Sequence, residues 1–191
     1  MLMKLLAILL ASLLSLHAEP GDKIIAAAHK QVGVTVTYDP TYVSLAYPNG
    51  DVPLDRGVCS DVLIRALRDA LAEDLQKLVH EDMRSHFSDY PKLWGMTRTD
   101  SSIDHRRVPN LRAYLKRRGC QLPLPKPGDV TAFHPGDIVT CNVASSLPHV
   151  MIVSDHKTAD GHPMVIHNIG GGALEEDSLL SYPITGHYRW K

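Results

Sequence analysis

The chain of 191 residues lacks an excess of charge of either sign: it has 20 basic and 21 acidic residues and a formal net charge of −1. Proteins that bind nucleic acids or anionic lipids through charge rely on clustered basic residues. The short basic run at residues 116–118 fits the solvated end of a helix. We therefore expect neither a nucleic acid nor a charged membrane surface as a partner.

The chain also lacks a long hydrophobic run. The run Leu5–Leu16 has 12 residues, whereas about 20 are needed to cross a bilayer. Lys4 before this run and the small Ala18 after it are typical of a secretory signal. We predict a signal peptide over residues 1–18 and a single exported domain over residues 19–191, periplasmic or secreted, with no membrane span after cleavage. A retained membrane anchor is the alternative.

Cysteine is scarce, with three residues in the chain. An odd number in an exported protein leaves at least one cysteine outside any internal disulfide. If two of them pair, Cys120 and Cys141 are the easier pair, because they flank a 20-residue segment rich in proline and glycine. Closing that loop would contribute about 3 kcal/mol, and Cys59 would be left over.

The first part of the chain has helical periodicity. Residues 21–33 resemble a helix that ends at Gly33, and residues 74–87 and 108–119 predict two more helices. From Cys59 to residue 71, apolar or small residues recur at helical spacing. This stripe predicts a half-buried helix whose other face carries Asp61 and Arg65.

After about residue 129 the period changes. Residues 136–143, 149–155 and 163–169 are short β-branched runs separated by turn residues, and residues 186–190 offer one more strand. Their spacing fits antiparallel strands joined by hairpins. Helices followed by strands predict an α+β fold.

Cys59 lies at the predicted start of a helix, directly after a turn-rich loop. The unpaired N–H groups and the dipole of a helix N-terminus favour a thiolate. Cys59 also belongs to the apolar stripe, and free cysteines are often buried in cores. Taken alone, this segment leaves both a core thiol and a nucleophile open.

Two histidines bear on this choice. His149 begins one predicted strand and His167 ends the next one. In an antiparallel hairpin these two positions reach the same edge of the sheet. A thiol nucleophile needs an imidazole base, and that base needs a third group to orient it. Each histidine considered singly fits a surface position equally well, since the chain has eleven.

Four motifs follow one another in the chain: VCSDV around Cys59, PGDIV at 135–139, PHVMIVSD at 148–155 and VIHN at 165–168. This order resembles the NlpC-type cell-wall cysteine peptidases, which are papain-like amidases. The segments YPNGDVP, DLQKLVHEDM, IDHRRVPNL and ITGHYR resemble one exported bacterial family of unassigned function within that superfamily. The resemblance extends from about residue 22 to residue 190.

The resemblance implies a papain-like fold with N-terminal helices packed on a small antiparallel sheet. It implies Cys59 as nucleophile, His149 as general base and later acid, and His167 as the orienting third member. The implied reaction is acyl transfer through a thiolate–imidazolium pair, with the backbone N–H of Cys59 in the oxyanion hole and no cofactor. Three positions depart from the family pattern, namely Val58, Asp61 and Met151; the last two bear on the substrate more than on the chemistry.

Substrate contacts are expected from the polar cluster at residues 101–111. Arg106 or Arg107 could hold a carboxylate of a peptidoglycan stem peptide, because guanidinium binds carboxylates in a bidentate manner. The alternative is a loop whose arginine is salt-bridged within the protein. The further substrate-binding candidates are Asp61, Tyr38 and Asn168. A second oxyanion donor is expected from Tyr38, Tyr42 or Tyr47.

The leading hypothesis is an exported cysteine hydrolase that cleaves an amide or peptide bond, most simply in peptidoglycan. A second hypothesis has the same cysteine chemistry but a lipid or a small amide as the substrate, as in an amidase or acyltransferase. A third is a zinc site made by the same cysteine and histidines, although no C-x-x-C or H-E-x-x-H pair is present. A fourth is a non-catalytic envelope module.

Overall fold

The computed structural model describes residues 18–144 and 146–191. The predicted signal peptide therefore lies outside the described residues, apart from Ala18. Within the described part, no helix is both long enough and apolar enough to cross a membrane. Export and cleavage stay predictions.

The first half of the described chain is helical. Its helices are α2 (Pro20–His29), α3 (Cys59–Leu71), α4 (Leu75–Ser85) and α5 (Val108–Arg117). Two short strands, β1 (Thr37–Tyr38) and β2 (Arg56–Gly57), pair in parallel between α2 and α3. Gly119 follows α5 with a φ of +75°, the left-handed conformation predicted for a helix end.

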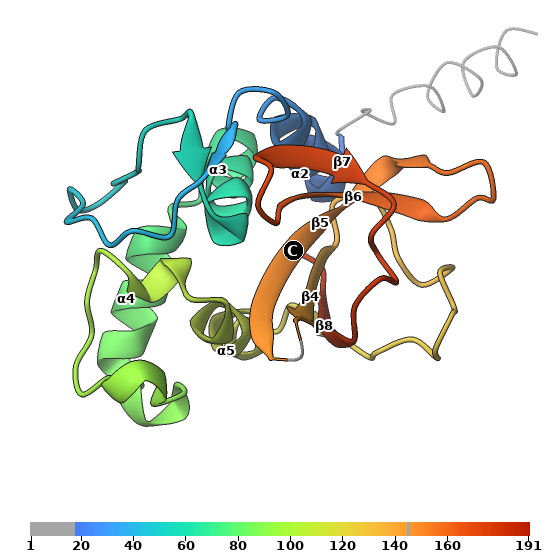
Figure 1. The fold of residues 1–191 in the computed structure, drawn as a ribbon. Coiled ribbons are helices and arrows are strands. Elements are labelled where there is room, and N and C mark those ends of the chain that lie inside the picture. Colours follow the sequence, from blue (N-terminus) through green and yellow to red (C-terminus); the bar gives the residue numbers. More distant parts are fainter. Residues whose placement is uncertain (1–17, 145) are drawn as a thin grey trace, which may run out of the picture.

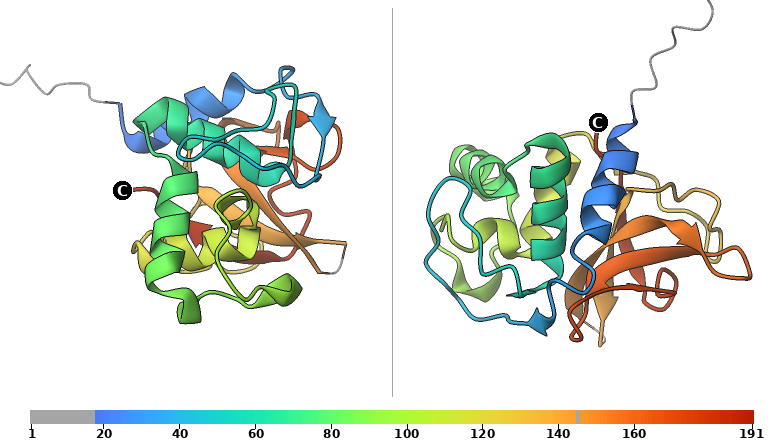
Figure 2. Two further views of the ribbon diagram at one scale, coloured as in Figure 1. Left: turned by 90° about the vertical axis from the view of Figure 1, so that its left-hand side faces the viewer. Right: turned by 90° about the horizontal axis from the view of Figure 1, so that it is seen from above.

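The second half forms a six-stranded antiparallel sheet in the order β3-β8-β4-β5-β6-β7. Its strands are β3 (Gln121–Leu122), β4 (Ile138–Val143), β5 (Leu147–Lys157), β6 (Pro163–Asn168), β7 (Ala173–Glu176) and β8 (Ile184–Tyr188). The helices gather on one side of the molecule and the sheet lies on the other (Figures 1 and 2). The predicted α+β class, with helices packed on a small antiparallel sheet, is confirmed.

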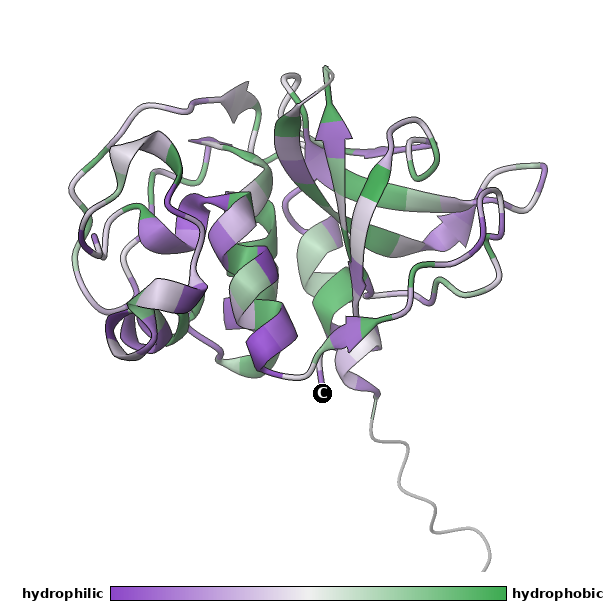
Figure 3. Ribbon diagram, turned by 90° about the horizontal axis from the view of Figure 1, so that it is seen from below, coloured by the Kyte–Doolittle hydropathy of each residue, from purple (hydrophilic) through white to green (hydrophobic). Residues whose placement is uncertain are grey.

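Apolar residues cover both faces of the sheet. Val150 and Ile152 of β5 belong to the core shared with α2 and α3, whereas Met151 and Val153 belong to a second core with Val139 of β4. This division follows from the alternation of side chains along a strand. Figure 3 shows green, hydrophobic stretches both on strands of the sheet and on the helices.

Helix α3 is more buried than its periodicity predicted. Leu63 and Leu67 are almost fully buried, and each contributes about 1.5–3 kcal/mol. The predicted polar face is buried as well, because the loop before the helix wraps over it. Arg65 donates to Asp51 and to three backbone carbonyls of that loop, and Asp61 pairs with Arg106. The face opposite the apolar stripe is therefore buried at Asp61 and Arg65, beyond the predicted half-burial, while Asp69 on the same face is exposed.

One further expectation needs correction, and one question that the sequence left open is answered. Helix α2 ends at His29 and not at Gly33, because the N–H groups of Gln31, Val32 and Val34 each donate to the carbonyl three residues back instead of four. The Cys120–Cys141 disulfide, which the sequence left open, is absent among the described residues, where all three cysteines are free and buried. Cys120 lies in the core on the helical side and Cys141 in the core on the opposite side of the sheet.

Candidate active site

Cys59 is the first residue of α3. Val58 before it is extended, and its backbone N–H donates to Asp61 Oδ2 over 2.7 Å. Asp61 thereby ties down the start of the helix from its third position, as the acidic residue of a capping box does. The backbone N–H groups of Cys59 and Ser60 face the sulfur, since the first turn of a helix leaves them without partners of their own.

His149 and His167 lie on neighbouring antiparallel strands, as predicted. His149 Nε2 is 2.8 Å from His167 Nδ1, and the two rings meet edge to face at 74°. Both side chains are buried. The sequence prediction that these histidines meet is confirmed in geometry.

Glu176 extends this pair and was not expected from the sequence. Its Oε2 atom lies 2.9 Å from His167 Nε2. An ionised carboxylate only accepts hydrogen bonds, so His167 Nε2 carries a proton and, in the neutral ring, Nδ1 is the acceptor. His149 must then donate from Nε2, and its Nδ1 is left with a free lone pair. The signal for Glu176 was the acidic pair at 175–176 just beyond the glycine-rich turn that follows His167.

The sulfur of Cys59 lies beside the strand that carries His149. The backbone N–H of Val150, the residue directly after His149, faces the sulfur. On the β6 side, the pairing of β5 is recorded from Ile152 and Ile166 onward, whereas on its other side Val150 is paired with Thr140 of β4. No hydrogen bond joins the sulfur to either imidazole within the described residues.

Burial controls the charge of these groups. It raises the pKa of the Cys59 thiol to about 11, while the backbone N–H of Val150 acts in the opposite direction. Burial, reinforced by His167, lowers the pKa of His149 to about 3. Burial also lowers the pKa of His167, partly offset by Glu176. Thiol and imidazole are therefore both neutral near pH 7, and the expected resting thiolate–imidazolium pair is not supported.

Cys59 forms part of the wall of a cleft of 310 Å³. The cleft is mainly apolar, and its lining residues are Tyr38, Pro40, Val58, Cys59, Trp94, Ile103, Arg106, Arg107, Val108, Pro109, Leu147 and Pro148. Cys59 itself is 6% exposed. A substrate in this cleft would reach the sulfur from the side of the helix N-terminus.

The two arginines of the predicted substrate cluster differ. Arg106 binds Asp61 through two hydrogen bonds of 2.9 Å, and both side chains are buried. Ser60 Oγ also donates to the backbone carbonyl of Arg106. This pair holds the start of α3 against the short 3-10 helix Asp104–Arg106. The contacts favour a structural role for Asp61 and Arg106, and Arg106 also lines the cleft.

Arg107 remains a candidate for substrate binding. Its guanidinium lies 5.0 Å from the centre of the Trp94 ring and donates to Met96 Sδ over 3.5 Å. Neither partner is a carboxylate, and Arg107 is only partly buried at the cleft. Its charge is therefore available to an anionic group of a ligand.

Among the three candidate tyrosines, Tyr38 is the one that lines the cleft. The hydroxyls of Tyr42 and Tyr47 donate to Asp100 and Glu81 respectively. Burial raises the pKa of the Tyr38 hydroxyl, which keeps it protonated as a donor. Of the three tyrosines, Tyr38 is therefore the one whose position allows its hydroxyl to donate to a group bound in the cleft.

Asn168, the last predicted substrate contact, is buried and bonded within the protein. Its Nδ2 donates to the carbonyl of Gly57 over 3.0 Å, and its Oδ1 accepts from the N–H of Gly170. It therefore joins the end of β6 to the loop before Cys59, and this arrangement supports positioning of Cys59 rather than contact with substrate.

The fold and the site define an α+β protein with a cysteine at the N-terminus of a helix and a hydrogen-bonded histidine pair on the sheet that this helix packs against. A family model described as "Domain of unknown function (DUF1287)" matches residues 25–190, and the chain belongs to this family. It is similar to the uncharacterized protein YijF of Escherichia coli (strain K12), with 50% identity over 94% of this chain and 86% of that protein. The predicted membership of a family without an assigned function is thereby confirmed.

Among solved structures, NlpC1 from Trichomonas vaginalis is similar to this chain with a TM-score of 0.47 and 14% sequence identity. The alignment covers 91% of this chain and 45% of that chain. This chain therefore spans less than half the length of that protein.

Proposed function

We propose that this protein is an exported cysteine hydrolase that cleaves an amide or peptide bond in peptidoglycan stem peptides. The observation that carries the proposal is the chain of hydrogen bonds from Glu176 through His167 to His149. It fixes the tautomer of His149 in which Nδ1 can take a proton. The next residue on β5 is Val150, whose backbone N–H faces the Cys59 sulfur.

In the proposed reaction, His149 Nδ1 takes the thiol proton as the Cys59 sulfur attacks the carbonyl carbon. Proton transfer and attack occur together, because burial favours the neutral form of both groups before substrate binds. The charge that develops on the carbonyl oxygen is stabilised by the backbone N–H of Cys59 and by the hydroxyl of Tyr38.

The tetrahedral intermediate then collapses. His149 returns its proton to the nitrogen of the leaving amine, the C–N bond breaks, and a thioester to Cys59 remains. Water, deprotonated by the same Nδ1, attacks the thioester and releases the acid, and the proton goes back to the thiol. During both protonations His167 and Glu176 stabilise the imidazolium.

Arg107 supports a stem peptide as substrate, because these peptides carry carboxylates that a free guanidinium at the cleft would bind. The mainly apolar lining of the cleft favours a second candidate, the amide or ester of a lipid or a small acyl group, with acyl transfer in place of hydrolysis. A substrate panel distinguishes the two, since only the first substrate class should depend on Arg107.

The proposal is tested by mass spectrometry of peptidoglycan digested with the wild-type protein and with Cys59→Ala. Cys120→Ala is the matched control, because Cys120 is also a free buried thiol and does not line the cleft. We expect new muropeptide masses with the wild type and the control and none with Cys59→Ala. Equal digestion by Cys59→Ala would overturn the proposal.

A further inference from the structure

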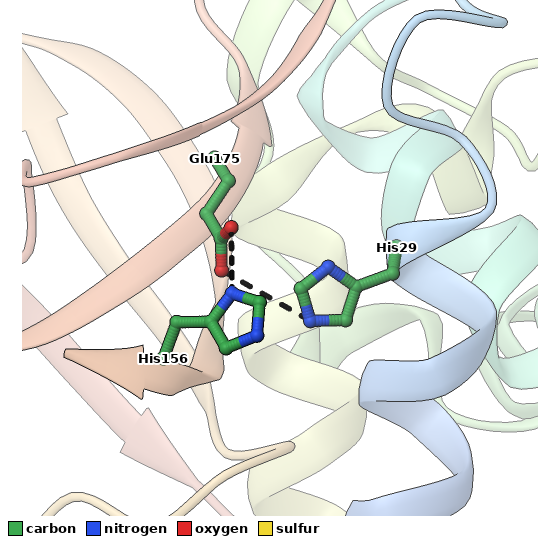
Figure 4. A group of neighbouring side chains, drawn as sticks. All are labelled: His29, His156 and Glu175. Carbon is green, nitrogen blue, oxygen red and sulfur yellow. Dashed lines mark hydrogen bonds and ion pairs between the residues drawn. The ribbon is translucent and has the colours of Figure 1, made fainter.

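A second cluster of polar side chains lies outside the candidate active site. His29 of α2, His156 near the end of β5 and Glu175 of β7 each offer one ligand atom, and these atoms lie within 4.8 Å of one another. Figure 4 shows the two imidazole rings and the carboxylate converging from three elements. Segments far apart in the sequence thus meet at one point.

Asp155 lies beside this cluster and offers a fourth possible ligand, a carboxylate oxygen. Its Oδ1 lies 2.8 Å from His29 Nε2, and Glu175 Oε2 lies 3.0 Å from His156 Nδ1. The second oxygen of Glu175 is 4.0 Å from His29 Nε2. In these contacts each carboxylate lies within hydrogen-bond distance of an imidazole nitrogen, and a bound cation would replace the hydrogen between them.

The backbone of β5 is irregular at this cluster. Between Val153 and Lys157 the strand has three intervening residues, whereas β6 has one between their partners Val165 and Pro163. Such bulges redirect side chains and are common beside functional sites. Here the irregular segment carries Asp155 and His156, and the hydroxyl of Ser154 within it donates to Glu175.

The cluster is separate from the proposed catalytic residues. Glu175 is paired with Ile166 and Glu176 with Val165, and these partners belong to the cores on opposite faces of the sheet. Consecutive carboxylates of β7 therefore serve different groups: Glu176 bonds to His167, and Glu175 bonds to His156 and Ser154.

We propose that His29, His156, Glu175 and Asp155 bind a divalent transition-metal ion, with Zn²⁺ as the best match. Two imidazoles with one or two carboxylates suit Zn²⁺, whereas Ca²⁺ and Mg²⁺ prefer oxygen ligands alone. The donor from Ser154 orients the Glu175 carboxylate in the way that outer hydrogen bonds orient metal ligands. This inference does not depend on the proposed catalytic function.

The bound ion would connect separate elements of the fold, and one side of it would be open to solvent. It would join α2 to the ends of β5 and β7, which come from opposite halves of the chain. The side chains of His156 and Asp155 are 61% and 51% exposed. Water or an exogenous ligand can therefore complete the coordination from the solvent side.

The test is calorimetric titration of the tag-free protein with zinc chloride, with magnesium chloride in parallel. We expect one zinc ion per chain and no heat from magnesium. His156→Ala and Glu175→Gln should each weaken zinc binding about tenfold or more. The control is His162→Ala, which removes an exposed histidine of the β5–β6 turn outside the cluster.

A second readout is the melting temperature. Zinc at 100 times its Kd should raise Tm by about 5–10 °C in the wild type and in His162→Ala, and by much less in His156→Ala. Cys59→Ala should bind zinc like the wild type. Unchanged binding by both His156→Ala and Glu175→Gln, or loss of binding in Cys59→Ala alone, would overturn the proposal.

Discussion

His149 Nε2 lies 2.8 Å from His167 Nδ1, on the strand next to it. Because Glu176 accepts from the other nitrogen of His167, this contact determines which nitrogen of His149 is free to act as a base. The carboxylate and the two imidazoles therefore form one hydrogen-bonded chain across β5, β6 and β7, to which the proposed reaction adds the Cys59 thiol of α3.

Glu176→Gln should lower kcat about tenfold with little change in KM, because an amide can donate to His167 Nε2 and favour the wrong tautomer of both rings. The loss should be moderate, since the Glu176 side chain is 38% exposed and water can replace part of its effect. Asp177→Asn, which changes the exposed acidic residue that follows, is the control. Equal kcat for the two variants across pH 5–9 would contradict the tautomer argument.

Asp61→Asn should destabilise the fold by about 3 kcal/mol, because it leaves the buried guanidinium of Arg106 without a counter-charge. Urea denaturation followed by circular dichroism measures this loss. Asp69→Asn, at an exposed position of the same helix, should change the free energy of unfolding by less than about 0.5 kcal/mol. If both variants unfold at the wild-type urea midpoint, the pair has no such role.

Arg107→Ala should raise KM about tenfold for substrates with a free carboxylate, because a charge-assisted hydrogen bond is lost at the cleft. The kcat value and the stability should be close to wild type. Arg98→Ala removes an exposed arginine that does not line the cleft. Steady-state kinetics with a substrate and its amidated form should show the effect for the free acid alone; an equal effect on both forms would argue against carboxylate binding.

The stability of the protein should decrease as the pH falls below about 6.5. Burial lowers the pKa of His149 and of His105 to about 3 in the folded chain, from an ordinary value of 6.5. The unfolded chain therefore takes up protons first, and each histidine removes about 1.4 kcal/mol of stability per pH unit between these values.

Urea denaturation at pH 7, 6 and 5 measures this slope. His105→Gln should remove the contribution of one histidine and leave that of His149. A free energy of unfolding that is constant from pH 6.5 to pH 5 in the wild type would contradict the neutral, buried state of both rings.

The main site residues were predictable because each depends on local pattern. The apolar stripe placed Cys59 at a helix start, and the two β-branched runs placed His149 and His167 at matching strand ends. Alternation and hairpin geometry then brought the histidines together without knowledge of the rest of the fold.

The remaining features depend on tertiary packing. Nothing local distinguishes Arg106, which is buried with Asp61, from Arg107, which stays available at the cleft. Glu176 lies on a short strand without a strand-like pattern, and its role depends on register. The cluster of His29, His156 and Glu175 requires an irregular β5 that no spacing rule indicates.

The central claim is that the Cys59 sulfur forms a covalent acyl intermediate. It is tested most directly by acid-quenching the wild-type protein with muropeptide substrate within milliseconds and mapping adducts by peptide mass spectrometry. We predict an acyl mass on the peptide that contains Cys59, which disappears on a longer incubation as product accumulates. Product formation with no adduct on Cys59, or with equal rate in Cys59→Ala, would contradict the account.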